Sequence, residues 1–332
     1  MLWTIIYLLG AYVAYWLVSY VVHRIPASDL SNKTVVITGC DTGFGQLLAL
    51  KLAHAGMTVF AGCLTDAGLR ALQQTAESQP TWKLHVFALD VTNVESVERF
   101  YSHVEKALPD KQAGVWALVN NAGVLRGGNL ETQPLSAWTL QLNVNVFGIA
   151  AMTKTFLPLL RRAKGRIINV ASVAGRLGTP GTSSYNASKF AVEGLSDAWR
   201  RELAIWGIDV VIIEPGIMKT PLWDQPLKDA EVDSVWGTLT AEQQQLYGRE
   251  YFAECYVAGK ELVDTIGGNP MMVVVRRRAT IEHASGSCAH QCTLAHTRTL
   301  SVCVSRRMPW PAPFEHDGLQ PGWPLATTHR SG

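Results

Sequence analysis

The sequence predicts an α/β fold: a doubly wound parallel sheet with helices on both faces, preceded by an N-terminal transmembrane helix. Two observations predict the sheet. Short apolar runs alternate along the chain with longer segments of helical periodicity, and a glycine-rich turn follows the first run. The transmembrane helix is predicted because residues 1–22 carry no charged side chain. With 332 residues and a hydrophobic content of 48%, the chain can bury one substantial core.

The N-terminal segment is long enough to cross a membrane. As a helix, residues 1–22 would span about 33 Å, against ~30 Å for a bilayer core. A cleaved signal peptide would need a basic leading region and a small-residue cleavage site, and neither is evident. We therefore expect an anchor over 1–24 and a linker over 25–32. Basic residues follow the apolar stretch and none precedes it, which places the rest of the chain in the cytosol.

Alternating apolar and helical segments follow the linker. The predicted strands are 34–38, 58–63, 84–89, 115–119, 166–171 and 209–214, and the predicted helices are 44–55, 66–78, 93–107, 135–162 and 185–206. Right-handed crossovers between such units place ligands at the carboxyl ends of the strands. Residues 221–262 are predicted to form helices that cover the substrate.

The C-terminal part of the chain has a different texture. We expect the domain to cover 33–273. Residues 274–332 show neither strand nor helix periodicity, and their last part is dense in Pro and Gly, which predicts a poorly ordered tail.

The overall composition argues against two kinds of partner. A net charge of +2 and the lack of a basic stripe interleaved with aromatics argue against nucleic acid. The six cysteines are scattered and suggest no disulfide framework. Cys288, Cys292 and His296 could be written as a metal motif, but accidental spacing in a poorly patterned tail is the better interpretation, so no metal is predicted.

A glycine turn follows the first predicted strand. Residues 34–45 read TVVITGCDTGFG, with Gly39, Gly43 and Gly45 before the next helix. Glycines let the backbone approach a pyrophosphate, and a helix N-terminus offers free N–H groups. The spacing differs from the common G-x-G-x-x-G pattern, so a tight structural turn is the alternative.

A second constellation carries acid–base chemistry. Tyr185 and Lys189 in YNASK are one helical turn apart and share a helix face. The ammonium group is expected to lower the pKa of the phenol, which starts near ~10. Ser172, at the carboxyl end of the apolar run RIINVAS, could hold a substrate oxygen beside the phenol. The alternative is that Tyr185 and Lys189 have this spacing by chance on a solvent-exposed helix face.

With four further motifs, these segments resemble the short-chain dehydrogenase/reductase family. The motifs occur in the family's order across 33–225: TGCDTGFG, Asp90 in LDV, NNAG at 120–123, Asn145 in NVFG, Ser172, Tyr185 with Lys189, and PGIMKT at 215–220. They look closest to the membrane-associated branch that contains retinol dehydrogenases, 17β-hydroxysteroid dehydrogenase type 6 and D-β-hydroxybutyrate dehydrogenase. The resemblance implies a Rossmann-type fold and a nicotinamide-dependent oxidoreductase.

The resemblance also implies catalytic roles. Tyr185 would be the general acid/base, and Ser172 would position the substrate oxygen. Lys189 would lower the pKa of Tyr185 and bind the nicotinamide ribose. Asn145 would hold a water that links Lys189 to solvent; alternatively, it is a helix-interior asparagine that bonds to its own backbone.

A larger set of residues is implied to bind the cofactor. Its members lie in the glycine turn, at the carboxyl ends of strands, on the catalytic helix and in the last loop: Gly39, Asp41, Gly43, Phe44, Gly45, Cys63, Asp90, Val91, Asn121, Ala122, Gly123, Tyr185, Lys189, Pro215, Gly216, Ile217 and Thr220. Asp90 would accept from the adenine amino group or, alternatively, cap the next helix. Asn121 would tie adjacent strands together, and Thr220 would bond the carboxamide.

The cofactor is expected to be NAD rather than NADP. A carboxylate at the end of the second strand would bind the ribose of NAD, and a basic residue would bind the 2′-phosphate of NADP. The position near Cys63 carries neither charge. Asp41, inside the glycine turn, would repel a 2′-phosphate.

The expected substrate is a lipophilic alcohol such as retinol or a hydroxysteroid, because the chain is anchored and rich in tryptophan. D-β-hydroxybutyrate is the alternative, and its carboxylate would need a cation such as Lys219 or Lys228. A catalytically impaired scaffold is a second alternative, because the further helix, strand and apolar segment with which relatives end are not found here.

The expected location is the endoplasmic reticulum membrane, with the domain in the cytosol and membrane lipid as a partner. A mitochondrial membrane is the alternative, and a homodimer is compatible with the resemblance.

Overall fold

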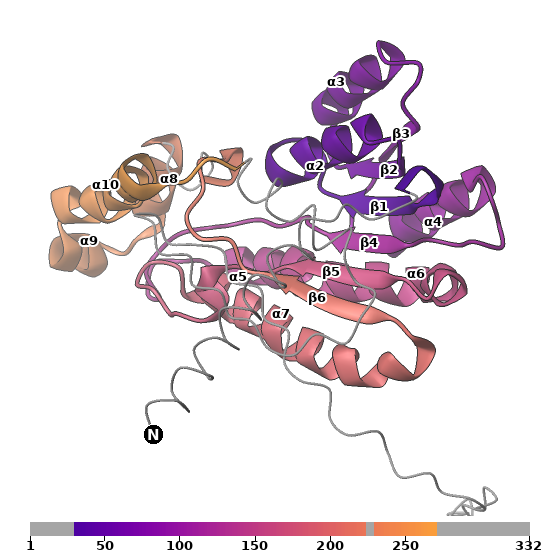
Figure 1. Cartoon of the computed structure of the whole chain (residues 1–332). Helices are drawn as coiled ribbons and strands as arrows, with labels where there is room; N and C mark the ends of the chain where they lie inside the picture. The colour runs from indigo at the N-terminus through magenta and orange to yellow at the C-terminus, as the bar shows by residue number, and fades with distance from the viewer. Residues whose placement is uncertain (1–29, 224–228, 271–332) are drawn as a thin grey trace, which may run out of the picture.

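Six parallel strands form the central sheet in a computed structural model that describes residues 30–223 and 229–270 (Figure 1). The strands are β1 (Thr34–Thr38), β2 (Thr58–Cys63), β3 (Leu84–Ala88), β4 (Ala117–Asn120), β5 (Arg166–Val170) and β6 (Asp209–Ile213). Their order is β3-β2-β1-β4-β5-β6, and every neighbouring pair is parallel. This confirms the doubly wound sheet, and the order reverses between β1 and β4, where such folds bind ligands.

Helices and short helical turns precede, connect and follow the strands. They are η1 (Leu30–Asn32), α2 (Gly43–His54), α3 (Asp66–Glu77), α4 (Val94–Ala107), α5 (Leu135–Leu142), η2 (Asn143–Gly148), α6 (Ile149–Ala163), η3 (Val173–Gly175), α7 (Ser183–Glu202), η4 (Ala204–Trp206), η5 (Pro221–Trp223), α8 (Asp229–Thr238), α9 (Ala241–Tyr247) and α10 (Arg249–Ile266). The helices α8, α9 and α10 match the predicted helical excursions after the last strand and form a group at one side of the sheet (Figure 1).

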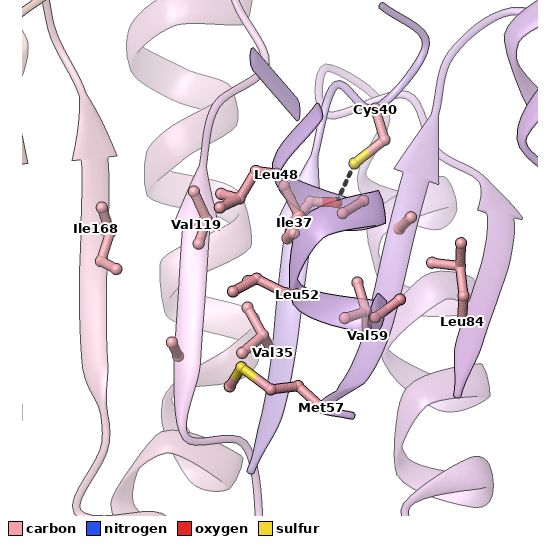
Figure 2. Close-up of a cluster of buried hydrophobic side chains, with 14 of the residues drawn as sticks. Val35, Ile37, Cys40, Leu48, Leu52, Met57, Val59, Leu84, Val119 and Ile168 are labelled. Atoms are coloured by element: carbon pink, nitrogen blue, oxygen red, sulfur yellow. Dashed lines mark hydrogen bonds between the residues drawn. The ribbon is translucent and has the colours of Figure 1, made fainter. Parts of the chain in front are cut away.

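The core lies on both faces of the sheet because successive strand residues point to opposite sides. On β1, Val35 and Ile37 pack under α2 and α3, while Val36 packs on the other face. Figure 2 shows the first of these clusters, with Leu48 and Leu52 of α2 lying over the strands. Side chains of α4 and α6 pack in the second cluster, and a third cluster contains side chains of α7 and β6. Burial on both faces explains why the strands read as continuous apolar runs.

The predicted helix over 135–162 is interrupted, which corrects the expectation of one regular helix. Residues Asn143–Gly148 form a π-helical turn between α5 and α6. A Cβ on Gly148 would lie 2.7 Å from Cγ2 of Val91, so the helix approaches the end of the neighbouring segment closely. Such π-turns inside helices are frequent at functional sites.

The alternative that Asp90 caps the next helix is wrong. The cap of α4 is Asn93, whose side chain accepts from the N–H of Ser96 at 2.9 Å. Asp90 instead accepts from the N–H and the hydroxyl of Thr92, at 2.8 and 2.7 Å. Asp90 therefore shapes the turn before the helix and does not cap it.

Several predictions concern parts of the chain outside the described residues. These are the anchor over 1–24, the start of the linker, the tail over 274–332 with its cysteine-rich segment, and Lys228. Within 30–223 and 229–270, no helix is long and apolar enough to cross a membrane.

Candidate active site

The glycine turn lies between β1 and α2 at the switch point of the sheet. Gly39 and Gly43 have φ angles of +67° and +62°, a backbone conformation that favours glycine. A Cβ on Gly45 would lie 2.2 Å from the carbonyl oxygen of Gly39. Thr42, at the N-cap of α2, makes no side-chain capping hydrogen bond. The first N–H groups of α2 are thus left for a ligand, which fits the pyrophosphate of a dinucleotide.

The end of β4 is fastened to this turn. The amide of Asn121 donates to the carbonyl oxygens of Thr38 and Gly39, at 2.9 and 3.0 Å. The Thr38 hydroxyl accepts from the N–H groups of Asn121 and Ala122. Asn121 does tie the two adjacent strands together, as predicted.

Asp41 joins the glycine turn to the end of β2. Its carboxylate accepts from the N–H groups of Leu64 and Thr65, at 2.9 and 2.7 Å, and from the Thr65 hydroxyl. Cys63 is fully buried in the first core cluster, and burial raises the pKa of its thiol to about 12. The surface at the end of β2 is therefore formed by Asp41 and by Leu64, which is largely exposed, while the Cys63 thiol faces the core.

The remaining predicted binding residues line the same edge of the sheet. Phe44 packs partly buried against the first core cluster, and Val91 is buried beside Gly148. Asp90 has its carboxylate in the turn described above.

The loop after β6 lies opposite the glycine turn. A Cβ on Gly43 would be 3.8 Å from the Thr220 side chain. The carbonyl oxygen of Pro215 accepts a hydrogen bond from the N–H of Val173 at 2.9 Å, and this bond links the loop to the end of β5. Gly216 and Ile217 follow half-buried, and the carbonyl of Ile217 accepts from the N–H of Gly268. The loop is thus held at both of its ends.

Tyr185 and Lys189 lie one turn apart on α7, and Ser172 follows β5. The side chain of Ser172 lies near the Tyr185 hydroxyl and acts to lower its pKa. Lys189 Nζ lies 5.6 Å from the centre of the Tyr185 ring and donates to the carbonyl of Val170 at 2.8 Å. Ser172 also accepts from the N–H of Ala174 at 3.2 Å. The structure thus brings the three predicted side chains together at the carboxyl end of β5.

The expected lowering of the Tyr185 pKa is wrong for this arrangement. Burial raises the pKa of Tyr185 to about 12, against the lowering effect of Ser172. Burial also lowers the pKa of Lys189 to about 8, because an ammonium group loses hydration in the interior. The sequence pattern reveals spacing but not the desolvation that both groups undergo.

Asn145 is buried in the π-helical turn and bonds to neighbouring segments. Its side-chain oxygen accepts from the N–H of Val124 at 2.8 Å, and its amide donates to the Val124 carbonyl and to the Ser188 hydroxyl. The alternative of bonding to its own helix backbone is therefore wrong. A Cβ on Gly123 would lie 3.3 Å from Asn145 Oδ1 and 3.7 Å from Lys189 Nζ, so Asn145 and Lys189 face the same short segment.

Three charged residues next to Lys189 were not predicted. Arg176 lies beside Glu193 and Glu214, and both carboxyl groups are buried. Two signals in the sequence could have identified the two glutamates. Glu193 follows Lys189 at the same four-residue interval, and Glu214 interrupts the apolar end of the last strand.

Of the two lysines considered as partners for a substrate carboxylate, one is described. Lys219 Nζ donates to the carbonyl of Asp264, near the end of α10, at 3.1 Å. In the described part of the chain, no three or more His, Cys, Asp or Glu side chains come together in a way that could hold a metal ion.

Comparisons with known proteins show what the chain is similar to. A protein-family model described as "short chain dehydrogenase" matches residues 33–231. Human "Retinol dehydrogenase 5" is 39% identical over 280 residues, covering 83% of this chain and 84% of the relative. "D-beta-hydroxybutyrate dehydrogenase, mitochondrial" of Rattus norvegicus is 40% identical over 234 residues, covering 69% of this chain and 67% of the relative. The crystal structure of a short-chain dehydrogenase from Streptomyces avermitilis has 26% identity and a TM-score of 0.60, covering 76% of this chain and 85% of that one.

Proposed function

The chain belongs to the short-chain dehydrogenase family, as an oxidoreductase acting on alcohols, and we propose that it uses NAD to interconvert a lipophilic alcohol and its carbonyl compound. The observation that carries the proposal is the placement of Ser172 near Tyr185, with Lys189 one turn away and the glycine turn at the same edge of the sheet.

The nicotinamide of the cofactor, when bound, takes up or supplies the hydride. The Ser172 hydroxyl holds the substrate oxygen, and the Tyr185 hydroxyl exchanges a proton with it. With a pKa of about 12, Tyr185 is a phenol at neutral pH and can donate its proton to a carbonyl oxygen. Alcohol oxidation instead needs the phenolate, which accepts the alcohol proton and which a cationic Lys189 favours.

Asn145 supports this arrangement from the π-helical turn. It holds the backbone of Val124 and the hydroxyl of Ser188, which in turn donates to the carbonyl of Tyr185 at 2.7 Å. We propose that these bonds fix the wall around Lys189, and that a water beside Asn145 gives the proton a route to solvent.

NAD is the proposed cofactor because the carboxylate of Asp41, in the glycine turn, is held against the residues that follow β2. Asp41 is anchored there by Leu64 and Thr65, so it cannot turn away without breaking hydrogen bonds. A negative charge held in this place repels a 2′-phosphate.

A lipophilic substrate is supported by the extent of the similarity to retinol dehydrogenase 5, which reaches beyond the matched family segment. The ammonium group of Lys219 is bonded at the end of α10, which leaves it poorly placed to pair with a small hydroxy acid. D-β-hydroxybutyrate is the second candidate because a relative of that name is similarly identical.

The proposal is tested with membranes that carry the full chain. We expect NADH to form from retinol or a hydroxysteroid, with less product when NADP replaces NAD. Tyr185→Phe should abolish turnover and leave cofactor binding, measured by thermal shift, intact. The matched control, Tyr101→Phe, removes a hydroxyl bonded to Glu105 on α4 and should keep activity. Cofactor binding without turnover of any alcohol would support the scaffold alternative.

We also propose that residues 1–22 anchor the enzyme in the endoplasmic reticulum membrane with the domain in the cytosol. Protease added outside sealed microsomes should digest the domain, and Asn32, in the glycosylation sequon Asn32-Lys33-Thr34, should stay unmodified. A protected domain or a glycan on Asn32 would place it in the lumen, and recovery with mitochondria would favour the alternative membrane.

A further inference from the structure

Behind the catalytic lysine lies a cluster of three charged side chains: Arg176, Glu193 and Glu214. Glu193 sits on α7 one turn after Lys189 and two turns after Tyr185, so the three side chains share one helix face. Glu214 directly follows β6. Glu193 and Glu214 are 6% and 2% exposed, which is unusual for carboxyl groups.

One cation serves two carboxyl groups in this cluster. Arg176 Nη2 lies 2.8 Å from Glu193 Oε2, and Arg176 Nε is hydrogen-bonded to Glu214 Oε1. If both carboxyl groups were ionised, the cluster would keep one uncompensated negative charge, which is costly in the interior.

The free oxygens of the cluster point to a shared proton. Glu193 Oε1, Glu193 Oε2 and Glu214 Oε2 are buried and accept no hydrogen bond within the part of the chain that the structure describes, although Arg176 Nη2 lies 2.8 Å from Glu193 Oε2. The two carboxyl groups lie on the same guanidinium group of Arg176, and Glu214 acts electrostatically on Glu193. A proton held between the two carboxyl groups would remove the excess charge and provide the missing donor.

The pair and Lys189 influence each other electrostatically. Burial and the charge of Glu214 raise the pKa of Glu193 to about 8, beyond the opposing effect of Arg176. A charged Glu193 in turn raises the pKa of Lys189, while burial lowers it to about 8. The charge on Glu193 therefore affects the ionisation of Lys189.

Other charges near Glu193 are few. On α7, Asp197 adds a smaller raising effect and is paired with Arg200. Of the elements packed against α7, α5, η2 and η4 carry no titratable side chain, η3 leads to Arg176, and β6 carries Glu214 at its end and Asp209 at its start. Tyr185 and the Val170 carbonyl complete the surroundings of Lys189.

We propose that Glu193 and Glu214 form a proton-sharing pair, and that an ionised Glu193 stabilises the ammonium form of Lys189, which in turn favours the phenolate of Tyr185. The effect on turnover rests on the proposed function; the effect on Lys189 does not. Glu193 acts through Lys189 and is a positioning residue.

When Glu193 is ionised, Lys189 keeps its ammonium proton to a higher pH, and this positive charge favours loss of the Tyr185 proton to solvent. When Glu193 is protonated, the neutral amine of Lys189 gains in population and this support for the phenolate is lost. Alcohol oxidation is therefore expected to speed up as the pair loses its proton.

The direct test is a titration of Lys189 in the full chain in detergent, without substrate, by NMR of ¹³C-labelled lysine. The Lys189 signal is identified by its loss in Lys189→Met. We expect a midpoint of about 8 in the native chain. Glu193→Gln should lower this midpoint by about one pH unit, because the stabilising charge is removed. Glu214→Gln should raise it, because Glu193 then ionises at lower pH.

The matched control is Asp197→Asn, which removes a carboxylate one turn further along α7 and should move the midpoint less than either glutamate variant, because Asp197 has the smaller effect on Glu193. Opposite shifts in the two glutamate variants support the proton-sharing pair, since a purely structural role would not produce them. An unchanged midpoint in Glu193→Gln, or shifts of the same sign in both variants, would overturn it.

Kinetics then test the link to catalysis. Near pH 8, kcat for alcohol oxidation should fall about tenfold in Glu193→Gln, with the Kd for NAD unchanged. In Glu214→Gln the rise of kcat should move to lower pH. An unaltered pH profile in Glu193→Gln would contradict the link. If the native chain oxidises no alcohol, the proposed function fails, and the titration still decides whether the pair controls Lys189.

Discussion

Asn145 forms two hydrogen bonds with the backbone of a single residue, Val124: it accepts from the N–H at 2.8 Å and donates to the carbonyl at 2.9 Å. Val124 follows the segment that leaves the end of β4, and Asn145 lies in the π-helical turn. The wider turn is thus bonded, through a side chain, to the segment that borders Lys189. Because these are buried polar groups, the loss of one partner leaves the others unpaired.

Asn145→Ala is expected to lower the free energy of unfolding by about 2–4 kcal/mol, since three hydrogen bonds are lost. It should also reduce kcat more than it raises the KM for NAD. Denaturant unfolding and steady-state kinetics check both effects. Asn143→Ala, in the same turn, is the matched control, and an equal loss in both variants would contradict the role of the Val124 contact.

Gly45→Ala is expected to disrupt the cofactor site. The new Cβ would lie 2.2 Å from the Gly39 carbonyl oxygen and 2.5 Å from the Asn121 amide, so the turn must shift. We expect NAD to bind at least about tenfold more weakly in calorimetry. Gly194→Ala on α7 meets no atom within 4 Å and should stabilise the protein by about 0.5–1 kcal/mol. If Gly45→Ala binds NAD normally, the backbone approach is not required.

Lys189→Met should stabilise the protein at neutral pH while it abolishes turnover. Burial lowers the pKa of Lys189 from 10.5 to about 8. Its stabilising contribution is therefore complete above the unfolded-state pKa and is lost as pH falls through about 8. We expect the variant to gain about 1–3 kcal/mol at pH 7 and no advantage above about pH 10.5. Denaturant unfolding at both pH values checks this, and a gain that does not depend on pH would contradict it.

Tyr247→Phe should weaken the attachment of α9 to the segment between β4 and α5. The Tyr247 hydroxyl donates to Glu131 at 2.7 Å, and this bond, with a second from Gln243, lowers the pKa of that carboxyl group. We expect the KM of the alcohol to rise about 2–5-fold with the Kd of NAD unchanged. Glu242→Gln, an exposed change on the same helix, should have no effect. An equal weakening of NAD binding would argue against a role confined to the substrate side.

Much of the fold could be predicted because local signals agree with the tertiary structure. The apolar runs are buried on both faces, and β1, β2 and the start of α2 fall close to the predicted positions. The π-helical turn could not be predicted, since it depends on contacts of Asn145 and Gly148 with segments distant in sequence.

The site was predictable in its residues but not in its electrostatics. The spacing of Tyr185 and Lys189 implies a shared helix face, which the structure confirms. The direction of the Tyr185 pKa shift was wrong, because burial depends on the whole fold. The contribution of Glu214 was missed for the same reason: β6 and α7 meet only in three dimensions.

The position of β1 in the middle of the sheet has a consequence for how the chain is made. β1 pairs with β2, the next strand to be synthesised, and with β4, whose residues Ala117–Asn120 emerge from the ribosome much later. Until then, one side of the nascent sheet presents unsatisfied backbone groups and an apolar surface. During synthesis, a chaperone or a non-native strand can therefore bind the free edge of β1 before β4 is available to pair with it.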